Sequence, residues 1–197
     1  MLKKAKIAVL VSGGGTNLQA LIDAQGTVIN SGEIVLVISN NPNAFALERA
    51  QKAGIATAVI ERKGNPDFED QIIAKLDKEE IDVIVLAGFM CILSEKFTRH
   101  FENRILNVHP SLIPSFCGEG FYGLRVHEAA LNYGVKVTGA TVHFVNEIPD
   151  GGKIILQKAV EIKEGDTPEI LQKRVMTEAE WIILPKATEM VCSEIIK

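Results

Sequence analysis

The sequence predicts an α/β fold: a doubly wound, mostly parallel sheet with an appended antiparallel strand pair and a C-terminal helix. The first observation is that apolar, β-branched runs alternate with segments of helical periodicity, as is typical of parallel strands covered by helices on both faces. The runs are 7–11, 34–39, 57–61 and 83–88, and the helical segments are 17–24, 44–54 and 67–80. The second observation is size: 197 residues with 47% hydrophobic content suit one core, so a single domain over 1–197 is expected.

The pattern changes in the second half of the chain. Helices are expected over 94–101 and 124–134, a strand over 105–109, and long strands over 135–145 and 153–162. Gly134 is placed as the C-cap of its helix. The two long strands are joined by a short connection, which favours an antiparallel pair. The chain then reads as helical, with Thr167 as N-cap, Pro168 as first helical residue and Glu169 in the first turn.

The composition argues against several partners and compartments. The formal charge of −4 comes without a Lys/Arg cluster, so a nucleic acid is not an expected partner. The three cysteines are widely spaced, which suggests neither a disulfide framework nor a zinc site and fits a reducing cytoplasm. The basic and then apolar start of the chain is too short for a secretory signal, and no run approaches a membrane span. We expect a cytoplasmic protein with no membrane partner.

A glycine-rich turn, SGGGTN at 12–17, joins the first strand to the first helix. Glycines let the backbone approach a ligand, and the free N–H groups at a helix start favour an anion. The turn has neither G-x-G-x-x-G nor G-K-[ST], so neither a dinucleotide nor a nucleoside triphosphate is supported. We expect a small phosphomonoester ligand, with a plain glycine-rich turn as the alternative.

The run ILNVHP at 105–110 places an amide and an imidazole at the end of a strand. Asn107 and His109 are two residues apart, so they point to one face, and Pro110 ends the ladder because it has no N–H. Ligands of open α/β sheets bind beyond the carboxyl ends of the strands. At that position Asn107 can donate to a carbonyl oxygen and His109 can exchange a proton near neutral pH, although a lone histidine is as readily structural.

Asp150 lies in NEIPDGG, between the two long strands. Asp-Gly is a common hairpin turn, and this structural interpretation is the simpler one for the aspartate taken alone. A carboxylate near His109 would favour the imidazolium and raise the pKa of the histidine. The sequence does not show whether the two side chains meet.

The other candidate residues are weaker. We expect a helix-dipole contact for His100, and structural or supporting roles for His127 and His143. The run FMCIL at 89–93 could belong to the core or could wall a flat, apolar ligand.

Taken together, these residues resemble the phosphoribosylglycinamide formyltransferases, a family of folate-dependent enzymes of purine synthesis. SGGGTNLQAL, FALERAQKAGI, VIVLAGFMCILS, NVHPSLIPSF, TVHFV and DGG occur in the family's order at about its spacing. NVHPSLIP, followed by an aspartate some forty residues later, is the specific part. The resemblance implies a Rossmann-like formyltransferase fold, with a phosphate-binding half over about 1–104 and a folate and catalytic half over about 105–197.

The resemblance also implies roles for individual residues. The catalytic trio would be Asn107, His109 and Asp150. Glycinamide ribonucleotide would be held by Gly14, Gly15, Thr16, Asn17 and Glu180. The folate would be held by Met90, Cys91, Ile92, Leu93, Asn107, Asn146, Glu147, Ile148, Pro149 and Asp150.

The implied reaction is formyl transfer from 10-formyltetrahydrofolate to the amine of glycinamide ribonucleotide. Asn107 and protonated His109 would stabilise the developing oxyanion, each such donor typically contributing about 3 kcal/mol. His109 would then help to pass a proton from the attacking amine to the leaving folate nitrogen, with Asp150 keeping the ring charged. We expect direct transfer without an acyl-enzyme or a metal, small-molecule partners only, and a monomer or weak homodimer.

The chain departs from the family pattern at three places. Cys91 stands where many members have arginine. The position near Asn65 that often carries a folate-binding arginine is not basic, and Arg62 or Lys63 could replace it. The loop over 117–123 is longer than in shorter members, and a flap over the substrate is one interpretation.

Three other functions stay open from the sequence. A formyltetrahydrofolate hydrolase and a formyltransferase acting on initiator methionyl-tRNA are related enzymes that, by resemblance, carry an extra domain for which this chain has no room. A non-catalytic phosphosugar-binding module on the same fold is the third, since fold does not imply function. The coincidence of Asn107 and His109 with the expected site disfavours it.

Overall fold

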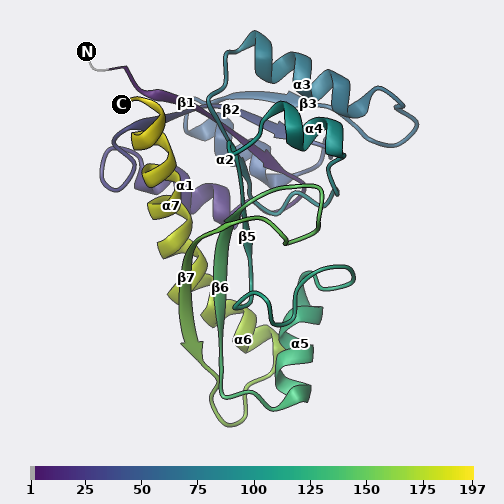
Figure 1. Cartoon of the computed structure of the whole chain (residues 1–197), viewed down its shortest axis with the longest axis vertical. Coiled ribbons are helices and arrows are strands. Elements are labelled where there is room, and N and C mark those ends of the chain that lie inside the picture. Colours follow the sequence, from purple (N-terminus) through teal and green to yellow (C-terminus); the bar gives the residue numbers. More distant parts are fainter. Residues whose placement is uncertain (1–2) are drawn as a thin grey trace.

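Residues 3–197, as described by a computed structural model, form one seven-stranded sheet with helices on both faces (Figure 1). The strand order is β3-β2-β1-β4-β5-β6-β7. The strands are β1 (Ala5–Val11), β2 (Gly32–Ser39), β3 (Ala56–Val59), β4 (Val83–Leu86), β5 (Ile105–His109), β6 (Val137–Phe144) and β7 (Ile154–Glu161). The helices are α1 (Thr16–Ala24), α2 (Phe45–Lys52), α3 (Phe68–Lys78), α4 (Glu95–His100), α5 (Leu124–Tyr133), α6 (Pro168–Val175) and α7 (Trp181–Ile195), with a π-helical turn, η1 (Met176–Glu180), before α7. The predicted α/β class is confirmed.

The strand directions divide the sheet into a parallel and an antiparallel part. β1 pairs in parallel with β2 and β4, and the parallel pairing continues through β3 and β5. β6 runs antiparallel to both β5 and β7, which confirms the appended antiparallel pair. The chain order reverses between β1 and β4, and the crevice beyond the carboxyl ends at such a reversal is where open α/β sheets bind ligands.

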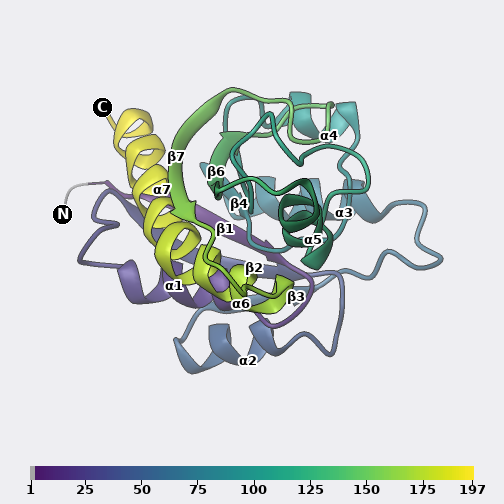
Figure 2. The same ribbon diagram turned by 90° about the horizontal axis from the view of Figure 1, so that it is seen from below.

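Alternate side chains of β1 enter two separate apolar layers, as the pleat of a strand requires. Ile7 and Val9 pack in the layer that contains buried residues of α1, α2, α6 and α7. Ala8 and Leu10 pack in the layer that contains the aromatic and aliphatic side chains of α3 and α4. Figure 2 shows these two groups of helices on opposite sides of the sheet. The strands are therefore buried on both faces, which explains their continuous apolar sequences.

Several helix ends follow directly from local chemistry. Gly134 closes α5 with φ 83°, a left-handed conformation that glycine adopts without a steric penalty. Ser94 and Thr167 cap α4 and α6 by accepting hydrogen bonds from the N–H groups of residues three positions ahead. Pro168 opens α6, as expected from its sequence.

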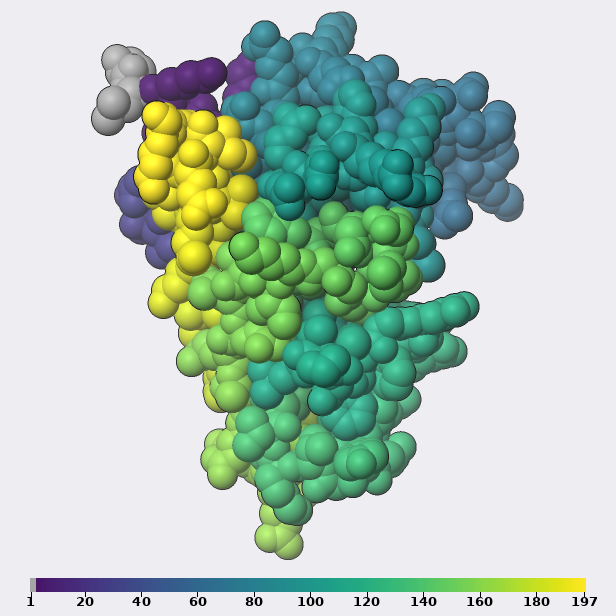
Figure 3. Space-filling model, viewed as in Figure 1, coloured from purple at the N-terminus to yellow at the C-terminus, as the bar shows by residue number. Residues whose placement is uncertain are grey.

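The C-terminal helix is present but is not regular along its length. Between α6 and α7, η1 is a π-helical turn, in which the hydrogen bonds span five residues instead of four. Within α7, Pro185 has no N–H to donate to the preceding turn. Helical periodicity does not reveal such a turn, so the sequence prediction of one helical segment missed it. The last part of the chain lies against the N-terminal strand at one end of the molecule (Figure 3).

Candidate active site

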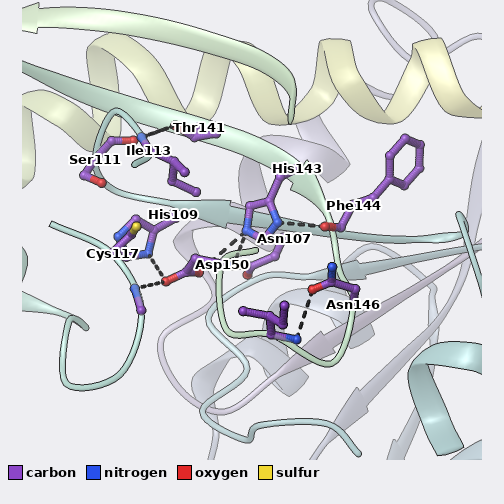
Figure 4. Close-up of polar contacts among 12 residues, drawn as sticks. Asn107, His109, Ser111, Ile113, Cys117, Thr141, His143, Phe144, Asn146 and Asp150 are labelled. Atoms are coloured by element: carbon purple, nitrogen blue, oxygen red, sulfur yellow. Dashed lines mark hydrogen bonds and ion pairs between the residues drawn. The ribbon is translucent and has the colours of Figure 1, made fainter. Parts of the chain in front are cut away.

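The carboxyl end of β5 is the centre of a cluster of polar side chains (Figure 4). β5 ends at His109, where Pro110 was predicted to stop the ladder. β6 lies alongside and places His143 directly opposite Asn107 in the register. The loop between β6 and β7 brings Asp150 to the same place, with φ 57°, a left-handed conformation that aspartate tolerates better than most residues. The structure thus brings together the three residues predicted as the catalytic trio.

Asp150 connects the two histidines of this cluster. Its Oδ2 lies 3.4 Å from Nδ1 of His109, and its Oδ1 lies 3.6 Å from Nε2 of His143. The backbone N–H of Gly118 donates to Oδ2 at 2.9 Å. Burial raises the pKa of Asp150, but the contacts with His143, Gly118 and His109 outweigh burial, so the pKa lies below its ordinary value. The carboxylate is therefore charged at neutral pH.

His109 does not titrate as the sequence predicted. Its side chain is only 5% exposed, and burial disfavours the charged ring. The charge of Asp150 and the carbonyl of Phe116 favour the imidazolium, but burial is the larger effect and the pKa of His109 is lowered. The expectation of a raised pKa is wrong. Asp150 acts in the predicted direction, but the degree of burial that outweighs it depends on segments far away in the sequence.

His143 orients Asn107. Nδ1 of His143 lies 2.8 Å from the carbonyl oxygen of Phe144, which can only accept, so Nδ1 carries the proton. Nε2 of His143 is then free to accept from the side-chain N–H of Asn107 at 3.3 Å. His143, for which a structural or supporting role was expected, therefore fixes the direction of the amide at the site.

A cavity of about 130 Å³ opens beside Asn107 and Asp150. Apolar side chains form its walls and polar groups lie among them, a combination that suits a flat heteroaromatic ligand. It is lined by Leu86, Phe89, Cys91, Ile92, Leu93, Asn107, His143, Val145, Asn146, Glu147, Ile148, Pro149 and Asp150. All residues predicted to hold a folate lie in this lining except Met90. The side chain of Met90 is outside the lining, and its backbone N–H donates to Oγ of Ser12 at 2.8 Å.

Cys91 and the segment around Asn65, where the chain departs from the family pattern, have defined surroundings in the structure. Nδ2 of Asn40 lies 3.0 Å from Sγ of Cys91, which accepts its hydrogen bond. Arg62 and Asn65 line a second hollow together with Lys96, whereas Lys63 is not among its lining residues. Of the two basic residues that could replace the folate-binding arginine, Arg62 is therefore the one that lines this hollow.

The glycine-rich turn is shaped by close packing on α2. Gly15 is the N-cap of α1 with φ 72°, and a Cβ built there would lie 2.6 Å from Cβ of Ala46. The carbonyl of Gly13 accepts from Ala46 at 3.0 Å, and that of Gly14 accepts from the side chain of Arg49 at 2.8 Å. This turn can therefore approach α2 only because residue 15 is glycine.

Two of the residues predicted to hold the ribonucleotide, Asn17 and Glu180, are far apart in the sequence but are in contact in the structure. Nδ2 of Asn17 donates to Oε2 of Glu180 at 2.8 Å, and the hydroxyl of Thr16 lies 3.4 Å from Sδ of Met176. Glu180 is 7% exposed, and burial raises its pKa despite the Asn17 hydrogen bond. Glu180 is the last residue of η1, and π-helical turns occur frequently at functional sites.

Sequence reasoning missed two features near His109. The loop before α5 touches the site through backbone groups of Phe116 and Gly118, and only its three glycines, all with positive φ, could have indicated an unusual backbone. His127 is completely buried, and within the described part of the chain neither of its ring nitrogens has a hydrogen-bond partner.

His100 ends α4 as expected, and its Nε2 lies 3.0 Å from Asp77.

None of the helices in residues 3–197 is both long enough and apolar enough to cross a membrane. No group of three or more histidine, cysteine, aspartate or glutamate side chains in that range could hold a metal ion. The expectation that no metal takes part stays a prediction.

The sequence matches known proteins along most of its length. Residues 5–188 match the family model described as formyl transferase. The chain is 43% identical over 175 residues to phosphoribosylglycinamide formyltransferase of Escherichia coli, covering 87% of this chain and 80% of that protein. It is 47% identical to the human trifunctional purine biosynthetic protein adenosine-3 over 97% of this chain, but it spans only 19% of that longer protein.

Solved structures agree with these matches. The glycinamide ribonucleotide transformylase 1 of Symbiobacterium toebii has a TM-score of 0.90 at 40% identity, with 97% of this chain and 89% of that chain covered. The phosphoribosylglycinamide formyltransferase of Brucella melitensis has a TM-score of 0.88 at 42% identity, with 97% of both chains covered.

Proposed function

Because the chain belongs to the formyl transferase family, we propose that it transfers the formyl group of 10-formyltetrahydrofolate to the amine of glycinamide ribonucleotide, a step of purine biosynthesis. The observation that carries the proposal is the meeting of Asn107, His109 and Asp150 beside the cavity at the carboxyl end of the sheet. These side chains come from two separate elements, β5 and the loop after β6. The three named relatives that are matched over most of their length carry this activity in their names.

The catalytic roles follow from the charges at the site. Asn107 is oriented by His143 so that its amide can donate to the oxygen of the formyl group as negative charge develops there. His109, whose pKa is lowered, starts as a neutral ring and can accept a proton from the attacking amine. Asp150 stays ionised and stabilises the imidazolium that forms at that moment. This order replaces the sequence expectation of a histidine that is charged from the start.

Two separate groups of residues would hold the two substrates. The cavity beside Asn107 and Asp150 would take the folate ring, with the loops at 89–93 and 146–150 as its walls. The turn at Gly14 to Asn17, together with Glu180, would take the ribonucleotide. Asn17 and Glu180 belong to the two halves distinguished from the sequence, so the proposed single domain binds this substrate with both halves.

The test is a comparison of folate deformylation with and without glycinamide ribonucleotide, followed by absorbance. We expect release of tetrahydrofolate only when the ribonucleotide is present, and a fall of at least about 100-fold in His109→Gln. His100→Gln is the matched control. Like His109 at the end of β5, His100 ends its element, α4, and lies beside a carboxylate, but it is on the surface. Release without the ribonucleotide would indicate a hydrolase, and no release with either mixture would indicate a binding module.

The proposal extends to the setting of the reaction. We place it in the cytoplasm, with the two small molecules as the partners and the chain as a monomer or weak homodimer. Size-exclusion chromatography with light scattering over a range of protein concentrations would measure the oligomeric state. A stable complex at the lowest concentration would contradict that part of the proposal.

A further inference from the structure

The loop between β5 and α5 folds back onto the catalytic pair through its backbone. The carbonyl oxygen of Phe116 accepts a hydrogen bond from Nε2 of His109 at 2.8 Å. Two residues later, the N–H of Gly118 donates to Oδ2 of Asp150 at 2.9 Å (Figure 4). His109 and Asp150 are 41 positions apart in the printed sequence. One short piece of backbone therefore fixes two side chains that come from different elements, β5 and the loop after β6.

The conformation of this piece is itself held in place. Phe116 and Gly118 have φ values of 48° and 87°, both in the left-handed region. The ring of Phe116 packs edge-on against Phe121 and against Tyr133 of α5, with centroids 6.4 Å and 6.0 Å away. Sγ of Cys117 donates to the carbonyl of Pro114 at 3.3 Å. Aromatic packing on α5 and a glycine at residue 118 thus aim the two backbone groups at the site.

The contact with Phe116 determines which nitrogen of His109 carries the proton. A backbone carbonyl can only accept, so Nε2 must be the donor, and the neutral ring is protonated there. Nδ1 then keeps its lone pair and lies 3.4 Å from Oδ2 of Asp150. A proton arriving at Nδ1 would be stabilised at once by that carboxylate.

We infer that the backbone of Phe116 and Gly118 positions the catalytic pair: it keeps a proton on Nε2 of His109 and so leaves Nδ1 as the nitrogen that exchanges protons during formyl transfer. The amine nitrogen forms a bond to the formyl carbon, and the bond from that carbon to the folate nitrogen breaks. Nδ1 takes one proton from the attacking amine and returns one to the folate nitrogen that leaves, so the ring begins and ends neutral. This inference rests on the proposed function for its chemistry. Phe116 and Gly118 are positioning residues, because they act through His109 and Asp150.

The groups that face His109 lie on β6, on the loop after β6, on the loop before α5 and on α5. Asp150, on the loop after β6, and the carbonyl of Phe116 favour the protonated ring, whereas His143 of β6 disfavours it. His127 of α5 is lowered in pKa to about 4, by burial first and then by His109, so it is uncharged near neutral pH. Burial and Asp150 raise the pKa of Cys117, so the thiol is uncharged as well. Losing the Phe116 contact should therefore lower the pKa of His109 further.

Two glycines of the loop offer a matched pair of variants. Gly118 and Gly120 both have φ 87°, and a Cβ built at either meets no atom within 4 Å. Alanine is therefore strained to a similar degree at both positions, but only residue 118 touches Asp150. We expect Gly118→Ala to lower kcat at least about tenfold with little change in KM, and Gly120→Ala to stay within about twofold of the parent chain.

Two further readouts separate positioning from a general loss of structure. Gly118→Asn should recover part of the lost kcat, because asparagine tolerates left-handed backbone better than alanine. In Phe116→Ala, which loses the packing on Phe121 and Tyr133, the acid limb of the kcat/KM profile should move to lower pH. Equal losses in Gly118→Ala and Gly120→Ala would overturn the inference.

The tautomer itself can be observed without any turnover. In ¹⁵N-histidine-labelled protein at pH 7.5, the ring nitrogens of His109, identified by their disappearance in His109→Gln, should show the Nε2-protonated form. Gly118→Ala and Phe116→Ala should show a mixture of the two neutral forms. A proton on Nδ1 of His109 in the parent chain would overturn the inference. An Nε2-protonated ring in a chain that transfers no formyl group would instead overturn the proposed function, and the proton exchange with it.

Discussion

Asp150 and Glu180 are two carboxylates at the two ends of the proposed site, and their pKa values are shifted in opposite directions. Glu180 is buried, with 7% of the residue exposed, whereas Asp150 is partly buried, with 12% of its side chain exposed. The pKa of Asp150 is nevertheless lowered, whereas burial raises that of Glu180. Asp150 meets Gly118, His109 and His143, while within residues 3–197 the hydrogen bond of Glu180 comes from Asn17 alone. Glu180 is the more deeply buried of the two and has one neutral partner, whereas Asp150 is only partly buried and has several partners, so burial and partners together set the opposite directions of the two pKa values.

His127 is the extreme of the same comparison. It is completely buried, and neither ring nitrogen has a partner among the described residues. Its pKa falls to about 4, chiefly because of burial. A completely buried group without partners is thus held in its neutral form.

The largest effect is expected from removing the charge of Asp150. Asp150→Asn should lower kcat about 10³-fold, because an amide cannot stabilise the protonated ring of His109. Steady-state kinetics with both substrates would measure it. The control is Asp77→Asn, which removes a carboxylate beside His100 on the surface. A similar loss in the two variants would mean that the charge of Asp150 has no special role.

His127 should make the protein less stable in acid. Its folded-state pKa of about 4 lies below the ordinary 6.5, so the unfolded chain binds the proton more tightly. Its contribution is complete above about pH 6.5 and is lost as the pH falls toward 4, by up to about 3 kcal/mol. Urea unfolding of the parent chain and His127→Leu at pH 7, 5.5 and 4.5 would measure the difference. The same acid loss in both proteins would contradict this account of His127.

A substitution at Gly15 would test whether close packing on α2 fixes the turn that carries Asn17. Gly15→Ala should destabilise the fold by about 2 kcal/mol and raise KM for the ribonucleotide, because the new Cβ would collide with Ala46 and the backbone is left-handed. Gly26→Ala is the control, since Gly26 has a similar φ of 75° and open space around it. Thermal unfolding and KM would be measured for both. Equal destabilisation would show that strain, and not the contact with α2, dominates.

Glu180 should show the opposite dependence on pH. Because its folded-state pKa is raised, its neutral form is stabilising below the ordinary pKa of 4.5, and stability is lost as the pH rises through the folded value. Glu180→Gln should therefore gain stability relative to the parent chain as the pH increases above 4.5. Its KM for the ribonucleotide should rise about tenfold, equivalent to about 1.4 kcal/mol of binding. Glu178→Gln, in the same turn, should change neither quantity.

Local patterns predicted the architecture well because they depend on neighbouring residues. The alternation of apolar strands and amphipathic helices, the end of β5 at Pro110 and the glycine cap of α5 each follow from backbone geometry within a few positions. The C-terminal segment shows where this reasoning stops. Thr167 and Pro168 begin the helix as expected, but nothing in their neighbourhood announces the wide turn at 176–180.

The candidate site divides in the same way. The residue types and the two-residue spacing of Asn107 and His109 identified the pair, and the resemblance to a family assigned Asp150, otherwise a candidate turn residue, to the same site. The contacts of Phe116 and Gly118 could not be predicted, because backbone groups have the same chemistry at every position and only the path of the loop aims them at His109 and Asp150.

The sequence by itself thus determined the order of strands and helices, the family and the residues that could carry the chemistry. The tertiary structure alone decided how those residues are charged. His109 was expected to be raised in pKa by Asp150, and it is lowered because the ring is almost completely removed from water. Desolvation depends on every segment packed around a group, whereas the identity of its partners can be written in a short motif.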